Sequence, residues 1–132
     1  MREIEFRGKI VGAEGFVYGK LLAPLASGNA YIAYDVNEVG SFVYISRSEK
    51  VDPETVGQYT GLKDKNGKKI FEGDVGWDEH NECYGVVKFE EGKFLYVWEN
   101  IAEDLWEVAD DIEICGNIHE NPELMEGTVN EK

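Results

Sequence analysis

The chain has 132 residues and a formal net charge of −14, with 42% hydrophobic and 12% aromatic residues. This length fits one domain or two small subdomains, and the hydrophobic fraction excludes a wholly disordered chain. The apolar runs are far shorter than the roughly 20 residues that span a bilayer, no signal-peptide core follows the N-terminus, and two cysteines cannot build a disulfide framework. We therefore expect a soluble intracellular protein with reduced cysteines.

The negative charge is concentrated towards the C-terminus. Residues 1–50 hold six acidic and six basic residues, residues 51–98 hold ten and six, and residues 99–132 hold eleven and one. A surface of this sign repels phosphate backbones, so broad nucleic-acid binding is not expected. The acidic third is interpreted either as a solvated face or as a surface that docks on a basic partner.

Strand patterns dominate the first fifty residues. Apolar Ile4 and Phe6 alternate with charged residues, which is typical of a half-buried strand. Further strands are predicted at 15–19, 30–34 and 41–45, with a turn at 27–29. Pro53 then interrupts the pattern and favours a linker. We predict a single domain over 1–132, with a possible division into β subdomains at 1–52 and 53–132.

A series of short strands follows Pro53. These are predicted at 56–62, 70–71, 73–77, 84–89 and 94–98. Their spacing suits a meander that curves into an SH3-like half-barrel. Helical spacing is expected over 101–108, a last strand over 112–114, and a short C-terminal helix after Asn121-Pro122. The predicted fold is therefore mostly β, with this half-barrel packed with the N-terminal β subdomain.

The most basic part of the chain lies in TVGQYTGLKDKNGKKIFEGDVG, from Thr55 to Gly76. Asn66-Gly67 predicts a tight type I′ hairpin turn. The candidate binding residues surround this turn: Lys63, Lys65, Lys68 and Lys69. They could contact a phosphate or an acidic partner, including the acidic third of a neighbouring subunit. Alternatively, they form a solvated tip that keeps a strand edge from pairing.

No catalytic or metal site is predicted. The only histidines and cysteines are His80, Cys83, Cys115 and His119, which could together offer two nitrogens and two sulfurs to a tetrahedral zinc. Cys115, however, follows Ile114 in a predicted core strand, where a free cysteine acts as a small buried hydrophobic residue. Carboxylate pairs are expected by chance in so acidic a chain, and no nucleophile or phosphate-loop motif occurs. We expect neither enzymatic activity nor a cofactor.

The segment TVGQYTGLKDKNGKKIFEGDV resembles the central signature of the YopX family, proteins of phages and prophages of Gram-positive bacteria. The stretches REIEFRGK, FVYGKLL, VDPETVGQYTGL and ICGNIHENPEL resemble family positions in the same order. The chain departs from the family pattern at Gly76 and Cys115. Signature positions with expected structural roles are Thr55, Gly57, Tyr59, Thr60, Gly61, Asp64, Asn66, Gly67, Gly73, Asp74, Gly116, Asn117, Asn121 and Pro122.

The resemblance implies a mostly β fold, a phage or prophage origin, a cytoplasmic location in a bacterial host cell, homo-oligomers and no established biochemical activity. The main functional hypothesis is a non-enzymatic module that binds proteins or assembles with itself. One alternative is a small β-barrel that associates with nucleic acid through the lysine hairpin, with Tyr59 and Phe71 nearby. Another is an acidic decoy that captures a basic host protein. No membrane partner is expected, and exposed aromatics such as Trp98 and Trp106 would mark an interface.

Overall fold

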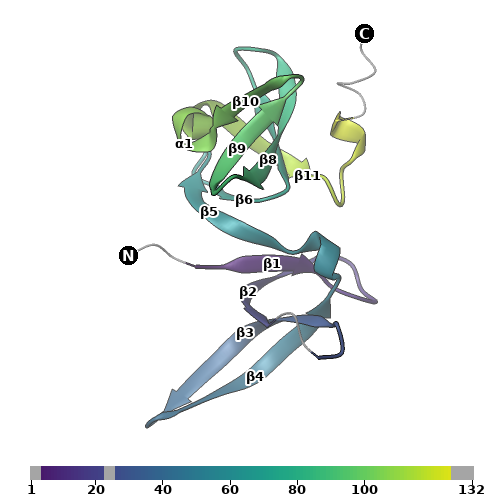
Figure 1. The fold of residues 1–132 in the computed structure, drawn as a ribbon, viewed down its shortest axis with the longest axis vertical. Helices are drawn as coiled ribbons and strands as arrows, with labels where there is room; N and C mark the ends of the chain where they lie inside the picture. The colour runs from purple at the N-terminus through teal and green to yellow at the C-terminus, as the bar shows by residue number, and fades with distance from the viewer. Residues whose placement is uncertain (1–3, 23–25, 126–132) are drawn as a thin grey trace. The chain divides into compact units, whose positions relative to one another are not determined.

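The computed structural model describes residues 4–22 and 26–125, and its contacts divide the chain into two compact units, Met1–Tyr59 and Thr60–Lys132. Antiparallel strands make up most of both units, so the mostly β prediction is confirmed (Figure 1). Strand β5, Gly57–Lys63, contains the boundary between the units.

The first sheet has six strands in the order β4-β3-β2-β1-β5-β6, and its strands up to the first part of β5 belong to the N-terminal unit. Its first four strands are β1 (Phe6–Lys9), β2 (Phe16–Leu22), β3 (Ala30–Val39) and β4 (Phe42–Val51), and a short 3-10 turn, Pro53–Thr55, precedes β5. Ala30, Ile32 and Val51 form a small core against which Phe6 and Leu21 pack. Alternate residues of each strand supply this core, as the period of two requires.

Strand β2 changes partner along its length. Its first half pairs with β1, up to the Phe6–Gly19 pair, and its second half pairs with β3 from the Lys20–Ala33 pair onwards. The change of partner brings two backbones together at Gly19. A Cβ atom on Gly19 would lie 2.2 Å from the carbonyl oxygen of Ala33. Only glycine leaves room for this approach.

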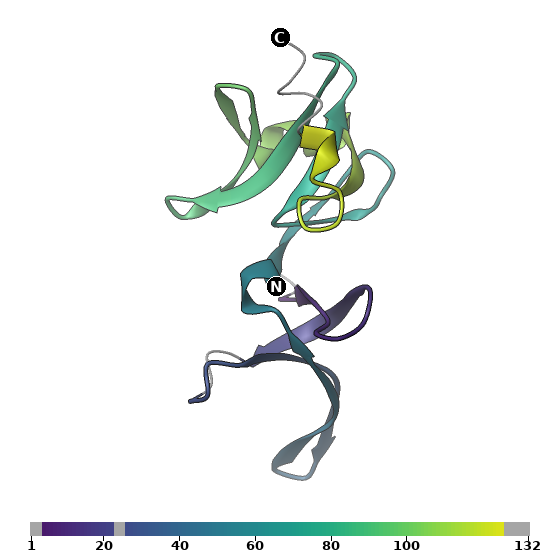
Figure 2. The same cartoon turned by 90° about the vertical axis from the view of Figure 1, so that its right-hand side faces the viewer.

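The C-terminal unit contains a five-stranded antiparallel sheet with the order β10-β9-β8-β7-β11. The elements after β5 are β6 (Lys69–Phe71), β7 (Asp74–Asp78), β8 (Cys83–Glu90), β9 (Lys93–Trp98), β10 (Ile101–Asp104), α1 (Leu105–Val108), the 3-10 turn Ala109–Asp111 and β11 (Ile112–Asn117). The predicted meander is present, and the sheet does not close into a barrel (Figure 2).

Of the one or two helical turns expected over 101–108, one is present, α1 at Leu105–Val108. Ile101–Asp104 is strand β10, which pairs with β9 from the Trp98–Ile101 pair to the Leu95–Asp104 pair. Cross-strand hydrogen bonds therefore override the helical spacing in this segment. The helix after Pro122 begins as predicted: residues 123–125 are helical, and the tail expected from Gly127 lies outside the described residues.

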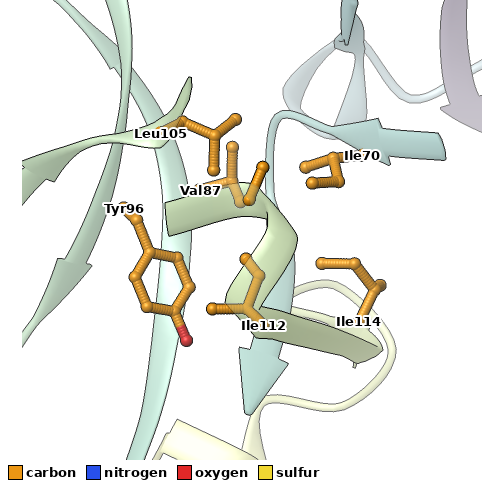
Figure 3. Close-up of a cluster of buried hydrophobic side chains, with 7 residues drawn as sticks. Ile70, Val87, Tyr96, Leu105, Ile112 and Ile114 are labelled. Carbon is orange, nitrogen blue, oxygen red and sulfur yellow. The ribbon is translucent and has the colours of Figure 1, made fainter. Parts of the chain in front are cut away.

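Tyr96 is the centre of the core of the C-terminal unit. It is buried with Ile70, Val87, Leu105, Ile112 and Ile114, and Figure 3 shows these side chains pointing toward one another. The Tyr96 hydroxyl donates a hydrogen bond of 2.9 Å to the Gly76 carbonyl. Gly76 and Gly85 lie opposite each other on β7 and β8, and their missing side chains leave the space that the ring fills. Gly76, where the chain departs from the family signature, thus has a packing role.

We predict that the C-terminal unit loses stability in alkaline solution. Burial raises the pKa of Tyr96, with Asp78 adding to the shift, and burial also raises the pKa of the Cys83 thiol. Groups with raised folded pKa values stabilise the fold fully below their ordinary pKa values, 10.0 for tyrosine and 9.0 for cysteine, and the contribution falls as the pH rises past them. The urea concentration at which half of the protein is unfolded should therefore decrease as the pH is raised above 10.

The comparison variant is Tyr96→Phe, which loses the hydroxyl and its hydrogen bond. It should be less stable at neutral pH, by about 1 kcal/mol, and its midpoint should depend less on pH in the alkaline range. Tryptophan fluorescence reports this unit alone, because Trp77, Trp98 and Trp106 all lie in it. If the urea midpoints of the wild type and Tyr96→Phe fall equally steeply as the pH rises, the loss of stability in alkaline solution does not come from Tyr96.

Candidate functional site

The turn between β5 and β6 is built around the Asp64 side chain. Asp64 Oδ1 accepts the backbone N–H groups of Asn66 and Lys68, both at 2.9 Å, and the Asp64 carbonyl accepts the N–H of Gly67. Gly67 has a φ of 83°, whereas Asn66 has no positive φ, so the predicted type I′ turn is wrong. The carboxylate favours a wider turn with a single left-handed residue. A type I′ turn requires two successive residues with positive φ, and these occur instead at Glu91 and Gly92, between β8 and β9.

The same carboxylate ties this turn to β11. Asp64 Oδ2 accepts the N–H of Ile114 at 2.8 Å, and the Lys65 N–H donates to the Ile112 carbonyl at 3.0 Å. Asp64 is only 5% exposed. A buried carboxylate requires such hydrogen bonds to offset its loss of water. Both carboxylate oxygens of this signature aspartate therefore accept hydrogen bonds from the chain's own backbone.

The structure brings the four candidate lysines together on this turn and its flanking strand ends. Lys63, Lys65 and Lys68 are exposed, and Lys69 is half-buried. Lys65 Nζ lies 3.5 Å from Glu79 Oε1, an ion pair at the surface. Pairs of this kind contribute little to stability, about 0–1 kcal/mol, but they reduce the local positive potential. The turn is a basic tip with an acidic neighbour of its own.

Other polar signature residues also bond to backbone groups. Thr60 donates its hydroxyl to the Ile70 carbonyl at 2.9 Å, and Asp74 Oδ2 accepts the N–H of Phe71 at 2.7 Å. The Thr55 hydroxyl oxygen accepts the N–H of Lys9 at 2.8 Å. Of the remaining positions before β6, Gly57 and Tyr59 are buried and Gly61 has a φ of 89°. These contacts fix turns and strand ends.

The late signature residues close a turn after β11. Asn117 Oδ1 accepts the N–H groups of His119 and Glu120, and the Asn117 carbonyl accepts the N–H of Asn121 at 2.7 Å. A Cβ atom on Gly116 would lie 2.4 Å from Asn121 Oδ1. Pro122 follows at the start of the helical turn, and Gly73 accepts the N–H of Ile118 at 2.9 Å. This part of the signature is also held by internal hydrogen bonds.

The histidines and cysteines do not form a metal centre. Within residues 4–22 and 26–125, no three His, Cys, Asp or Glu side chains are arranged to hold a metal ion. Cys83 is buried, whereas Cys115 is exposed, so the predicted burial of Cys115 is wrong. The pairing of β11 with β7 shifts between Ile114 and Gly116. Successive strand residues point to opposite faces, so Cys115 faces solvent while Ile112 and Ile114 face the core.

An exposed two-stranded arm is the most unusual surface of the N-terminal unit. We define the arm as residues 34–47, the outer part of the β3–β4 hairpin. β2 pairs with β3 only as far as Ala33, and beyond it β4 is the sole strand partner of β3 in the described part of the chain. Figures 1 and 2 show the tip of this hairpin extending past β2. The arm therefore has little protein against either face.

Both faces of the arm are apolar. The register places Val36 opposite Ile45 and Val43 opposite Glu38 on one face, and Val39 opposite Phe42 on the other, followed by Tyr44. Partners in an antiparallel pair share a face, and successive residues alternate. The exposed fractions are 43% for Tyr34, 42% for Val36, 59% for Val39, 75% for Phe42, 64% for Val43, 52% for Tyr44 and 44% for Ile45.

Sequence analysis predicted the strand at 41–45 but did not identify it as a site. A signal was present, because Phe42-Val43-Tyr44-Ile45 is an unbroken apolar run. Such runs are typical of strands that are buried on both faces. In this chain the run is exposed instead. Of the two tryptophans that would mark an interface only if exposed, Trp106 is 68% exposed and Trp98 packs against the core.

None of the helices in the described ranges has the length and apolar character needed to cross a membrane.

Comparisons with known proteins agree with the fold. A family model described as YopX protein matches residues 5–126. The crystal structure of protein EF1440 from Enterococcus faecalis is similar, with a TM-score of 0.68 and 21% identity, over 95% of this chain and 99% of that chain. At this identity the likeness concerns the fold alone. No curated protein matches the chain.

Proposed function

The chain belongs to the YopX protein family, and we propose that it is a non-enzymatic module that binds proteins, copies of itself included. The arm is the observation that carries the proposal. Seven large apolar side chains within residues 34–45 are each at least 42% exposed. Apolar patches of this kind on a monomer are typical of interaction sites. A phage or prophage origin and a role in the cytoplasm of a bacterial host cell are part of the proposal and rest on the family resemblance.

Catalysis is not part of the proposal. The carboxylates at the most buried signature positions, Asp64 and Asp74, accept backbone N–H groups, which occupies the oxygens that acid–base chemistry would use. Capture of a basic host protein by the acidic third of the chain is a competing function. It predicts a partner that is released by salt, because exposed charges are screened beyond about 8 Å at physiological ionic strength. Binding through the apolar arm should instead persist in salt.

We predict that the chain does not bind DNA or RNA through the lysine turn. Phosphate contacts need several uncompensated cations, and Lys65 is already paired with Glu79 in a chain of net charge −14. A titration of labelled single-stranded DNA or RNA at low salt and micromolar protein should show no change in anisotropy. Binding that disappears when Lys63, Lys65, Lys68 and Lys69 are all changed to glutamine would instead assign the turn as a nucleic-acid site.

Cross-linking in cells tests the proposed function directly. We expect cross-links from the tagged chain to other proteins, or to other copies of it, to concentrate on the arm. The double variant Phe42→Lys and Tyr44→Lys should lose them, because it places two charges on one apolar face. Ile101→Lys is the control, since Ile101 is 42% exposed and lies in the C-terminal unit. Cross-links that persist in the double variant would refute binding through the arm.

A further inference from the structure

We propose that the arm binds a second copy of this chain, with the outer edges of the two β4 strands paired antiparallel across a twofold axis. The inference rests on the proposed function, because it names the partner of the same surface. Two identical antiparallel strands are self-complementary, and a twofold axis satisfies both copies at once. The β3–β4 hairpin of each copy would then become half of a four-stranded ribbon.

The first support is the edge of β4. β4 is the outermost strand of its sheet. The base of this edge is covered, because Ile10 pairs with Val51 and the Val11 N–H donates to the Lys50 carbonyl at 2.9 Å. From Phe42 to Glu49, no strand in the described part of the chain covers the outer edge. The open part of the edge therefore coincides with the apolar part.

The second support is the scarcity of the usual protection over residues 42–45. Natural edge strands avoid pairing through lysines, prolines, inward charges, β-bulges or very short length. The pairing of β3 with β4 is irregular around Asp35 and Arg47 but regular over residues 42–45. β4 has ten residues, and residues 42–46 (FVYIS) contain no charge and no proline. Arg47, the first charged residue after this run, lies 3.8 Å from Asp35 within the same hairpin. The edge has the features of a strand that pairs with another chain.

The third support is the set of apolar side chains along the open edge. Phe42, Val43, Tyr44 and Ile45 lie on β4 itself and are 75%, 64%, 52% and 44% exposed. When two β4 strands pair, side chains on the same face of the neighbouring strands lie about 4.5–5.5 Å apart between their Cβ atoms. These side chains would then pack against those of the other copy and add to the backbone hydrogen bonds that join the edges.

Charge favours a second copy over a basic partner. Between residues 36 and 45 the arm has one charged side chain, Glu38, in a chain of net charge −14. Two such chains repel each other over most of their surfaces, and the arm is a region where they approach with little repulsion. A basic partner would gain nothing from this neutral surface. Another arm has the matching apolar and neutral character.

The mass in solution tests the inference. By light scattering after gel filtration, at physiological salt, we expect twice the chain mass of 14.9 kDa. Phe42→Lys with Tyr44→Lys should give the single-chain mass, and Ile101→Lys, in the C-terminal unit, should keep the doubled mass. A single-chain mass for the wild type, or a doubled mass in the double arm variant, would overturn the inference. Circular dichroism confirms that each variant is folded.

A disulfide test keeps the proposal falsifiable even if the lysine variants fail to fold. In a Cys115→Ser background, Ser46→Cys places a thiol near the middle of the open edge, and Asn66→Cys places one on the exposed lysine turn as a control. We expect a covalent dimer in a glutathione buffer for Ser46→Cys and none for Asn66→Cys. Equal cross-linking of the two, or none at Ser46→Cys, would count against paired edges.

A wild-type monomer with arm-dependent cross-links to another protein would sink this inference while leaving the proposed function intact. A monomer without them would sink both.

Discussion

Replacing Asp64 with alanine is expected to lower the free energy of unfolding of the C-terminal unit by about 3–4 kcal/mol. The carboxylate accepts three backbone N–H groups, from Asn66, Lys68 and Ile114, and it is 5% exposed. Each hydrogen bond to a charged group contributes about 1.5–3 kcal/mol, and a buried N–H left without a partner costs about 1–3 kcal/mol. Water can reach the exposed turn at Asn66 and Lys68 and partly replaces those bonds. The N–H of Ile114, in the core strand β11, has no such substitute.

Urea unfolding followed by tryptophan fluorescence measures this loss. Asp64→Asn should lie between the wild type and Asp64→Ala, because it keeps an acceptor for the turn but directs an amide N–H₂ towards Ile114 or the turn. Asp104→Ala is the control: Asp104 lies in the same unit and forms a surface ion pair with Lys93 at 3.0 Å, whose loss should cost little stability. An Asp64→Ala loss no larger than that of the control would contradict the role given to Asp64.

Gly85→Ala is expected to destabilise the same unit by about 2–3 kcal/mol. The added Cβ would lie 2.4 Å from Tyr96 Cζ and under 3 Å from both Cε atoms. The ring cannot move away easily, because Tyr96 is fully buried and its hydroxyl is bonded to Gly76. Overpacking of a core at this level costs about 1–3 kcal/mol and forces side chains away from their rotamers.

Gly76→Ala provides a graded comparison on the neighbouring strand β7, at the partner position of Gly85. Its Cβ would lie 3.2 Å from Tyr96 Cε1 and 3.3 Å from Ile112 Cδ1, a tight contact that small shifts can relieve. We expect a smaller loss than at Gly85, measured by the same urea titration. If the order were reversed, the ring of Tyr96 would not be the group that requires glycine at these positions.

Much of the fold could be predicted from local sequence signals. Alternation and turn residues located nearly all the strands, because period-two patterns and glycine turns act over a few residues. The segment 101–104 could not be assigned in this way, since its pairing with β9 depends on a hairpin that competes with helical spacing. The Asn66-Gly67 turn was mistaken for a type I′ turn because the side chain of Asp64 decides its geometry. That choice depends on Ile114, fifty residues away.

The candidate site was harder to predict than the fold. The four lysines stand out because charge is visible in a sequence. An apolar run such as Phe42–Ile45 looks like core until the structure shows how little of the sheet covers it. Exposure is a property of three-dimensional neighbours, which composition and periodicity do not encode.

Hydrogen exchange at two protein concentrations tests the central claim most directly. If β4 edges of two copies pair, the outward-facing amides of residues 42–49 should exchange slowly in concentrated protein and quickly after dilution. The amides of the lysine turn, residues 63–69, should exchange at the same rate in both samples. Exchange of residues 42–49 that does not depend on concentration, or a concentration effect confined to residues 63–69, would contradict an arm that joins two copies.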